Sequence, residues 1–140
     1  MGFLDKLFGG GAKYPDLADS SPTAKKLDAV KNSLEELTKK VNDPMEVVPA
    51  DDSAYIFIGN PPKNFGMAWI VDGKVHNFKT LSEEKGLPQK ELMKMVDELA
   101  EAYRQSDGES RYAATIGKRQ VTVTPSSELA TAVQEIIAGF

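Results

Sequence analysis

Few side chains of this chain could act together as catalysts. His76 is the only histidine and there is no cysteine, so histidine clusters, thiolate metal sites and cysteine nucleophiles are excluded in a single chain. A Ser-His-Asp triad is formally available, but the chain lacks the G-x-S-x-G motif that would place its serine. The serines gather at expected helix caps and turns, where backbone hydrogen bonding accounts for them. We therefore assign His76 no catalytic role.

The adjacent acidic pairs do not predict a catalytic dyad either. Neighbouring residues on a helix point about 100° apart, so two such carboxylates do not share one site. The pairs are Glu35-Glu36, Asp51-Asp52, Glu83-Glu84 and Asp97-Glu98. The glycines at 9–11 have neither a preceding strand nor the spacing of a phosphate-binding loop, and they indicate a linker. The sequence thus predicts no catalytic residue, no metal site and no cofactor.

Two aromatic residues and one basic pair are candidates for contact with another protein. Phe65 follows a loop stiffened by two prolines, and a rigid loop loses less entropy on binding. Trp69 is the only tryptophan; each aromatic belongs either to the core or to an interface. Lys118 and Arg119 stand at the expected tip of a hairpin, where they could contact a phosphate or an acidic partner.

Residues 1–8, MGFLDKLF, form a further candidate contact. In a short helix, four apolar side chains would share one side: Phe3, Leu4, Leu7 and Phe8. Such a segment could dock on a partner or a membrane surface, cover the core, or fray. Lys6 stands where a myristoylation motif requires Ser or Thr, so Gly2 predicts no lipid anchor.

Composition favours one soluble domain. A chain of 140 residues, 41% hydrophobic and 27% charged, can bury a core without disulfides. The net charge of −4 argues against general binding to nucleic acid or anionic lipid. No apolar run approaches the roughly 18 residues of a membrane span, and no secretory signal is recognisable. We therefore expect a cytoplasmic protein.

The hydrophobic spacing predicts three main helices. The first runs from Pro22 to about Asn42, capped by Ser21, with an apolar stripe of Leu27, Val30, Leu34, Leu37 and Val41. The second follows a helical turn at 81–86 and runs from Pro88 to about Ser106. The third begins at Ser126 and continues to the end of the chain.

Two groups of strands separate these helices. Residues 54–78 predict a three-stranded meander, in which the Asp72-Gly73 turn pairs Trp69 with His76 and Met67 with Phe78. Residues 45–48 are expected to form a short edge strand. Residues 111–124 predict a hairpin turning at Gly117-Lys118, with its apolar face toward the carboxy-terminal helix and its threonine-rich face in water.

The predicted fold is therefore α+β, with a mostly antiparallel sheet of about five strands and the order α-β-β-β-α-β-β-α. Residues 1–21 would be an amphipathic leader and glycine-rich linker, and residues 22–140 a single domain. The meander is apolar on both faces, so we expect the helices from Pro88 and Ser126 to cover one side, and the first helix or a second copy in a homodimer to cover the other.

In the order of its elements, the chain from Pro22 to Phe140 resembles the class I chaperones of type III secretion. The resemblance implies an acidic homodimer that binds an unfolded stretch of a partner. From the residues themselves we expect a non-enzymatic protein-interaction or adaptor domain, because apolar surface is abundant and reactive groups do not converge. The alternatives are a peripheral membrane or complex-tethered protein that uses residues 1–8, and a small-ligand binder or enzyme.

Overall fold

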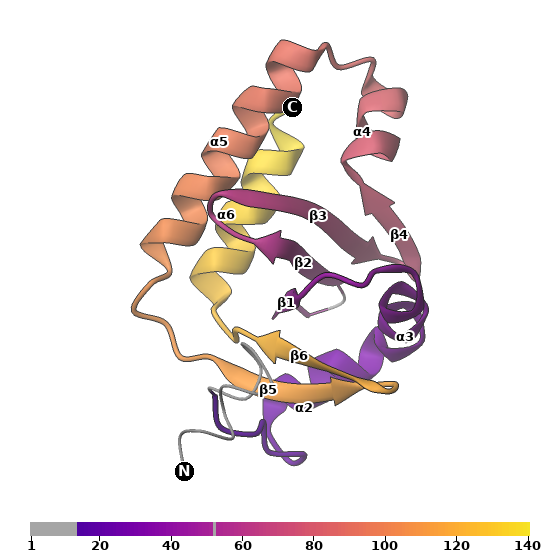
Figure 1. The fold of residues 1–140 in the computed structure, drawn as a ribbon, viewed down its shortest axis with the longest axis vertical. Coiled ribbons are helices and arrows are strands. Elements are labelled where there is room, and N and C mark those ends of the chain that lie inside the picture. Colours follow the sequence, from indigo (N-terminus) through magenta and orange to yellow (C-terminus); the bar gives the residue numbers. More distant parts are fainter. Residues whose placement is uncertain (1–13, 52) are drawn as a thin grey trace.

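A six-stranded mixed sheet forms the centre of the fold (Figure 1). The structure is a computed structural model that describes residues 14–51 and 53–140. The strand order is β4-β3-β2-β1-β6-β5. The strands are β1 (Met45–Pro49), β2 (Ser53–Asn60), β3 (Asn64–Val71), β4 (Lys74–Asn77), β5 (Tyr112–Ile116) and β6 (Arg119–Val123). The predicted α+β class is confirmed, with six strands in place of about five.

Five helices in the described part of the chain flank this sheet, where three main ones were expected. They are α2 (Pro22–Ala29), α3 (Lys31–Lys40), α4 (Phe78–Lys85), α5 (Gln89–Gln105) and α6 (Ser127–Ala138). The helix α6 begins one residue after the predicted start, because Ser126 caps it: its side chain accepts a hydrogen bond from the Leu129 amide at 3.1 Å. None of the described helices has both the length and the apolar character that crossing a membrane requires.

The meander of β2, β3 and β4 matches the sequence prediction closely. Trp69 pairs with His76 and Val71 with Lys74. Asp72 and Gly73 both adopt positive φ, at 53° and 74°, as a two-residue turn with the strand twist requires. The expected pairing of Met67 with Phe78 is absent, because Phe78 is already the first residue of α4.

The prediction that residues 45–48 form an edge strand is wrong. The strand β1 lies inside the sheet, antiparallel to β2 and parallel to β6, with Val47 opposite Val123. All five of its residues are buried, as expected for a strand covered on both faces. Pro49 is the last residue of the strand, where a missing amide donor costs little.

The first predicted helix is divided in two. Ser21 caps α2 as expected, its hydroxyl accepting from the Ala24 amide at 3.1 Å. The helix then ends at Val30, whose φ of −118° and ψ of 15° leave the helical region, and α3 starts at the next residue. The apolar stripe continues across this break, so its spacing alone did not reveal the bend.

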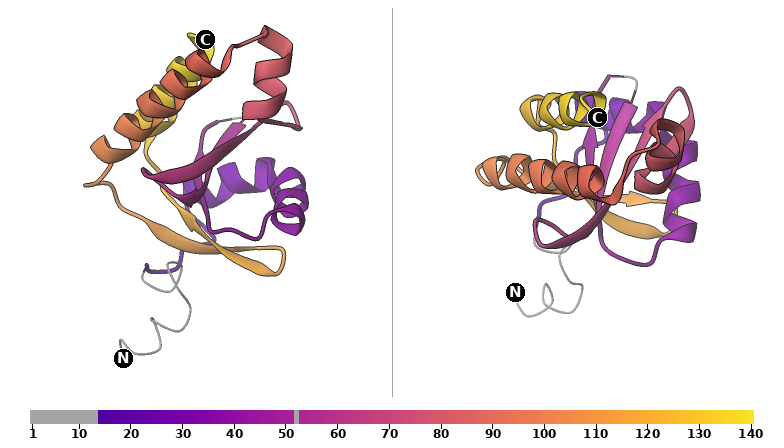
Figure 2. Two further views of the ribbon diagram at one scale, coloured as in Figure 1. Left: turned by 45° about the horizontal axis from the view of Figure 1, so that its top comes forward. Right: turned by 90° about the horizontal axis from the view of Figure 1, so that it is seen from above.

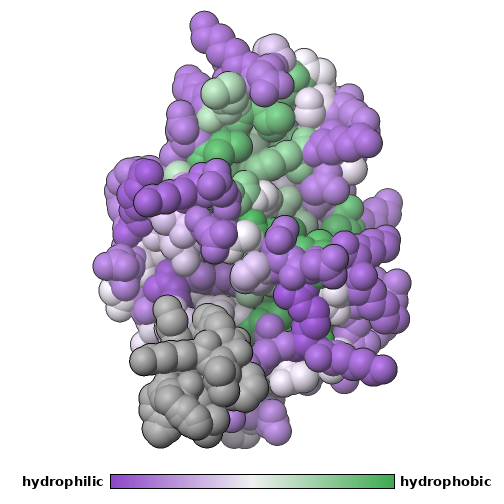
Figure 3. Space-filling model, in the orientation of Figure 1, coloured by the Kyte–Doolittle hydropathy of each residue, from purple (hydrophilic) through white to green (hydrophobic). Residues whose placement is uncertain are grey.

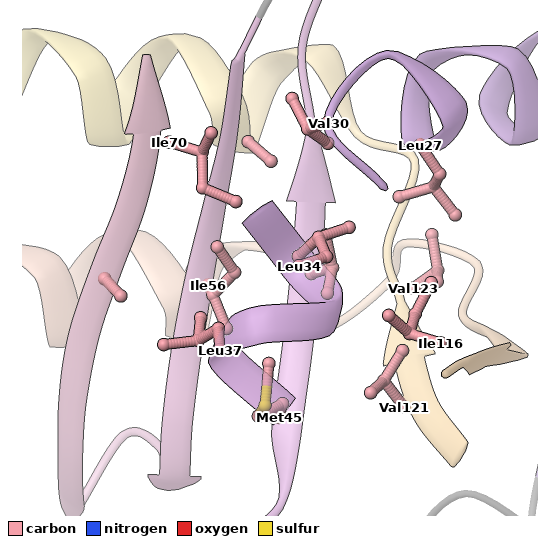
Figure 4. Close-up of a cluster of buried hydrophobic side chains, with 13 residues drawn as sticks. Leu27, Val30, Leu34, Leu37, Met45, Ile56, Ile70, Ile116, Val121 and Val123 are labelled. Atoms are coloured by element: carbon pink, nitrogen blue, oxygen red, sulfur yellow. The ribbon is translucent and has the colours of Figure 1, made fainter. Parts of the chain in front are cut away.

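Helices cover both faces of the sheet (Figure 2). On one face, side chains of α2 and α3 pack on alternate residues of the strands (Figure 4): Leu27, Val30, Leu34, Leu37, Met45, Val47, Ala54, Ile56, Ala68, Ile70, Ile116, Val121 and Val123. On the other face, α4, α5 and α6 form a second core with Val48, Tyr55, Phe57, Met67, Trp69, Leu81, Met95, Leu99, Leu129, Ala130, Val133 and Ile137. Helices of the same chain therefore cover both faces of the meander, so a second copy is not needed to cover either face.

The second hairpin has the expected turn but faces the other way. Its strands pair Ala114 with Val121, and Gly117 has a φ of 63°, which favours glycine. The apolar residues Ile116, Val121 and Val123 pack with α2 and α3, and not with the carboxy-terminal helix as predicted. The parallel pairing of Val123 with Val47 determines this facing, and the sequence does not indicate that pairing.

We expect Val121→Lys to lower the free energy of unfolding by more than about 3 kcal/mol, because it would bury an unpaired charge. Val121 is 2% exposed. Its neighbour Thr122 points to the opposite face and is half-buried, so Thr122→Lys should cost less than about 1 kcal/mol. Urea unfolding followed by tryptophan fluorescence measures both. Equal losses would contradict this assignment of the two faces.

The segment at 15–17 extends the sheet beyond β5. The Leu17 amide donates to the Ala113 carbonyl at 2.8 Å, and the Ala113 amide donates to the Pro15 carbonyl at 2.8 Å. Asp16 forms a parallel bridge with Ala113, and Leu17 packs against the core below α2 and α3. This short pairing covers the outer edge of β5, which would otherwise expose backbone groups to other chains.

Candidate interaction surface

The outer side of β3 is only half covered by β4. The strand β4 pairs with Ala68–Val71, whereas residues 64–67 of β3 pair only with β2. The chain leaves the sheet here because Asn77 caps α4: its Oδ1 accepts from the Thr80 amide at 2.9 Å, and its own amide donates to Thr80 Oγ1 at 2.9 Å. This reciprocal cap starts a helix where a strand could have continued.

A hollow of about 550 Å³ lies beside this uncovered part of β3. We call it the β3-edge hollow; its lining combines apolar side chains with three asparagines: Asp43, Ile58, Gly59, Asn60, Asn64, Phe65, Gly66, Met67, Asn77, Phe78 and Lys79. Phe65, a predicted interaction residue, is half-buried and packs on Phe57 with ring centroids 5.6 Å apart. It therefore belongs to the core on one side and to the surface on the other.

A second hollow, of about 220 Å³, lies between the start of α4 and the first half of α5. We call it the α4–α5 groove; it is lined by Phe78, Gln89, Leu92, Met93, Val96 and Asp97. Met93 is 59% exposed, whereas Phe78, Leu92 and Val96 are half-buried. Figure 3 shows hydrophobic side chains gathered between α5 and α4 in its upper part. Phe78 lines both hollows, so the two meet at this ring.

Trp69 packs beneath Phe78, the residue that lines both hollows. Only 5% of its area is exposed, and its ring packs edge-on against Phe78, with centroids 6.5 Å apart. His76, which pairs with Trp69 from β4, stacks on the indole, with ring centroids 6.2 Å apart and 18° between the ring planes. Trp69 is therefore a core residue whose ring contacts both Phe78 and His76.

The two basic residues predicted at the hairpin tip, Lys118 and Arg119, have different surroundings in the structure. Lys118 is exposed in the turn. Arg119 donates hydrogen bonds to the Val41 carbonyl and, at 2.8 Å, to the Asp43 carbonyl. Its guanidinium thus satisfies carbonyl groups after α3 and holds the loop that leads into β1. The remaining candidates, Phe3, Leu4, Leu7 and Phe8, lie outside the described residues.

A buried polar network, which the sequence did not reveal, connects β1 to the second hairpin. Glu46 accepts hydrogen bonds from the Tyr103 hydroxyl at 2.6 Å, from Arg111 Nε at 2.9 Å and from the Thr124 hydroxyl at 2.5 Å. Arg111 also donates to the Ser106 carbonyl at 3.1 Å and to its Oγ at 3.0 Å. In the described part of the chain, every buried side-chain nitrogen or oxygen has a partner.

The electrostatics of this network keep the Tyr103 phenol protonated and the Arg111 guanidinium charged. Burial and the hydrogen bond to Glu46 raise the pKa of the Tyr103 hydroxyl, and Arg111 offsets only part of this effect. Burial alone would lower the pKa of Arg111, but the Glu46 carboxylate outweighs it and raises that pKa. A protonated phenol and a charged guanidinium therefore donate hydrogen bonds to the Glu46 carboxylate, which indicates that the network holds β1, α5 and the second hairpin together.

The two hollows differ in their polar lining: the β3-edge hollow has Asp43 and Lys79 beside its asparagines, whereas the α4–α5 groove has fewer polar groups. Within residues 14–51 and 53–140, no three His, Cys, Asp or Glu side chains are placed to hold a metal ion. The α4–α5 groove has only Gln89 and Asp97 as polar lining residues, so it can bind apolar groups and offers no pair of acid and base. Comparison of the chain with models of protein families, with curated proteins and with solved structures found no match.

Proposed function

We propose that this chain is a non-enzymatic protein-interaction domain that binds a short apolar segment of a partner protein in the α4–α5 groove. The observation that carries the proposal is the exposure of Met93, at 59%, beside three half-buried apolar residues. An apolar centre surrounded by polar residues is the usual anatomy of a protein interface. Methionine suits such a surface because its flexible, polarizable side chain adapts to different partners.

The rim of the groove supports a protein partner over an isolated small molecule. Around Met93, the α5 side chains Lys90, Glu91, Lys94 and Asp97 form a wider, shallow depression. Two positive and two negative charges give this rim no net charge, so it does not select one sign of partner. Shallow apolar surfaces with a mixed rim fit a helix or an extended segment better than a compact ligand, which needs enclosure.

A second candidate function is the binding of an unfolded, extended partner segment along the uncovered edge of β3. The β3-edge hollow supports this alternative. Residues 64–67 have no strand partner on one side, and an extended peptide can pair with such an edge while alternate side chains enter pockets. Phe65 and Phe78 would receive those side chains. This alternative corresponds to the activity that the resemblance to the secretion chaperones implies.

Peptide selection tests the proposal directly. Short random peptides displayed on phage would be selected on the full chain, and the enriched sequences measured by fluorescence polarisation. We expect apolar consensus sequences whose affinity falls at least about tenfold with Met93→Glu, because the charge would occupy the apolar centre. Val75→Glu is the matched control: Val75 is also an exposed apolar residue, at 39%, and it pairs with Ile70 on the α2–α3 face.

The effects of the variants distinguish binding in the α4–α5 groove from binding in the β3-edge hollow. A loss with Lys79→Glu but not with Met93→Glu would place the peptide in the β3-edge hollow. Failure to enrich any sequence, or equal losses with Met93→Glu and Val75→Glu, would contradict the proposed function. Each position is exposed in the folded chain, so all three variants should fold, and circular dichroism checks this.

A further inference from the structure

We infer that residues 1–8 of a second copy of this chain occupy the α4–α5 groove, so that self-association competes with the partner. This inference rests on the proposed function of the groove and names a specific occupant. It follows from three features of the molecule: the chemistry of residues 1–8, the charge around the groove, and the distance between the groove and the place where the described chain begins.

Residues 1–8 have the side chains that the groove can bind. In a helix, Phe3, Leu4, Leu7 and Phe8 present one apolar side, and amphipathic helices commonly lie in apolar grooves with residues spaced this way. The groove offers Leu92, Met93, Val96 and the Phe78 ring. Eight residues form a marginal helix in water, so burial against such a surface would supply the missing stabilisation.

The charges of the two surfaces are balanced. Asp5 and Lys6 give the segment one charge of each sign, and the rim has Lys90, Glu91, Lys94 and Asp97. Neither surface attracts or repels the other strongly at a distance. Burial of apolar groups should therefore dominate the affinity, which should depend little on salt.

The length of the chain before Tyr14 favours a second copy over the same chain as the source of residues 1–8. The segment at 15–17 lies beyond β5, and β3 is five strand positions away, which is about 24 Å at the usual strand spacing. Residues 9–13 are the only link from Phe8 to Tyr14, and fully extended they span at most about 22 Å. In Figure 1, residues 15–17 lie at the bottom, and α4 and the first half of α5 at the top. A route over the surface is longer still, so Phe8 of the same chain would fall short of the groove, and a second copy is the better source of the whole apolar side.

A labelled peptide tests the inference. The probe is a fluorescent peptide of residues 1–11, and the receptor is the full chain with Leu4→Asp and Leu7→Asp, which removes competition from its own segment. We expect saturable binding in the micromolar range that changes less than about twofold between low and high salt. Met93→Glu in the receptor should weaken it at least about tenfold, Val75→Glu should not, and a peptide with both aspartates should not bind.

Light scattering tests whether the contact joins two chains. The wild-type chain at high concentration should have a mass above the 15.3 kDa of one chain, and the Leu4→Asp, Leu7→Asp variant should remain near that mass. A wild-type mass of one chain would overturn the inference, even if the peptide binds. Selected peptides that bind while the peptide of residues 1–11 does not would also overturn it and leave the proposed function standing. Binding of that peptide to phosphatidylglycerol vesicles, but not to the receptor, would assign residues 1–8 to membranes and overturn it as well.

Discussion

Replacing Glu46 by alanine is expected to lower the free energy of unfolding by about 3–5 kcal/mol, because it leaves the Arg111 guanidinium buried without its counter-charge. The side chains of Glu46 and Arg111 are 11% and 10% exposed, with Nε and Oε2 2.9 Å apart. The same change removes the acceptor of the Tyr103 and Thr124 hydroxyls, and each buried hydroxyl left without a partner adds to the loss. Urea unfolding of the variant measures the change.

A double-mutant cycle separates the ion pair from the rest of the network. Arg111→Met alone should also be costly, because it leaves the carboxylate buried. The combination of Glu46→Leu and Arg111→Met should cost less than the sum of Glu46→Leu and Arg111→Met measured singly, since apolar residues of similar size often replace a buried ion pair well. Strict additivity would show that the two charges do not interact in the folded protein. The exposed pair Lys39 and Glu36, at 3.2 Å, is the control and should contribute less than about 1 kcal/mol.

Trp69→Ala is expected to cost about 3–5 kcal/mol, the usual range for removing a large aromatic side chain from a core. The indole is 5% exposed and contacts Phe78 and His76. Val71→Ala is a matched control on the same face of the same strand; Val71 is 37% exposed, so the change should cost less than about 1 kcal/mol. The Trp69→Ala variant has no tryptophan fluorescence because Trp69 is the only tryptophan, so its unfolding should be followed by circular dichroism.

Two other results would contradict this placement of Trp69. A loss below about 1 kcal/mol would mean that the indole is not packed in the core. A folded Trp69→Ala monomer, formed from a wild-type dimer with unchanged stability, would place Trp69 at an interface, which was the alternative that the sequence left open. The structure makes the core role the expected one, because Phe78 and His76 cover the ring within one chain.

The local features of the fold were predictable because neighbouring residues determine them. Asp72-Gly73 and Gly117 supply the positive φ that their turns need, and Ser21 and Ser126 supply hydrogen-bond acceptors at helix starts. The apolar stripe of the first helix correctly identified buried residues. These signals act over two to four residues, a range in which backbone preference and capping outweigh the influence of the remaining chain.

The arrangement of the strands was not predictable in the same way. The parallel contact of β1 with β6 joins Glu46 to Thr122, and no local pattern records such a pairing. It alone determines that β1 is central, and that Val121 and Val123 face α2 and α3. The strand β1 offered one signal, since a run of buried apolar residues is typical of a strand covered on both faces.

The two most informative groups of side chains also depend on distant contacts. The partners of Glu46 lie 57, 65 and 78 residues away along the chain. A glutamate within the apolar run Met45–Val48 was the available hint, because a buried carboxylate requires partners. Met93 lies in the second predicted helix, but the sequence did not distinguish it from the other residues of that helix. Its place beside Phe78, the first residue of α4, is a contact between distant segments.

The central position of β1 has a consequence for folding during synthesis. The strand is complete once residue 49 has been made, yet its second neighbour, β6, ends at Val123. Until then one side of β1 exposes backbone donors and acceptors, and the core on the α5–α6 face lacks Leu129, Val133 and Ile137. Closing so long a loop is slow relative to forming a local hairpin. A growing chain therefore carries an unfinished sheet until β6 emerges and an unfinished core until the last helix emerges. Shortening that helix should harm folding more than its position at one end of the sequence suggests.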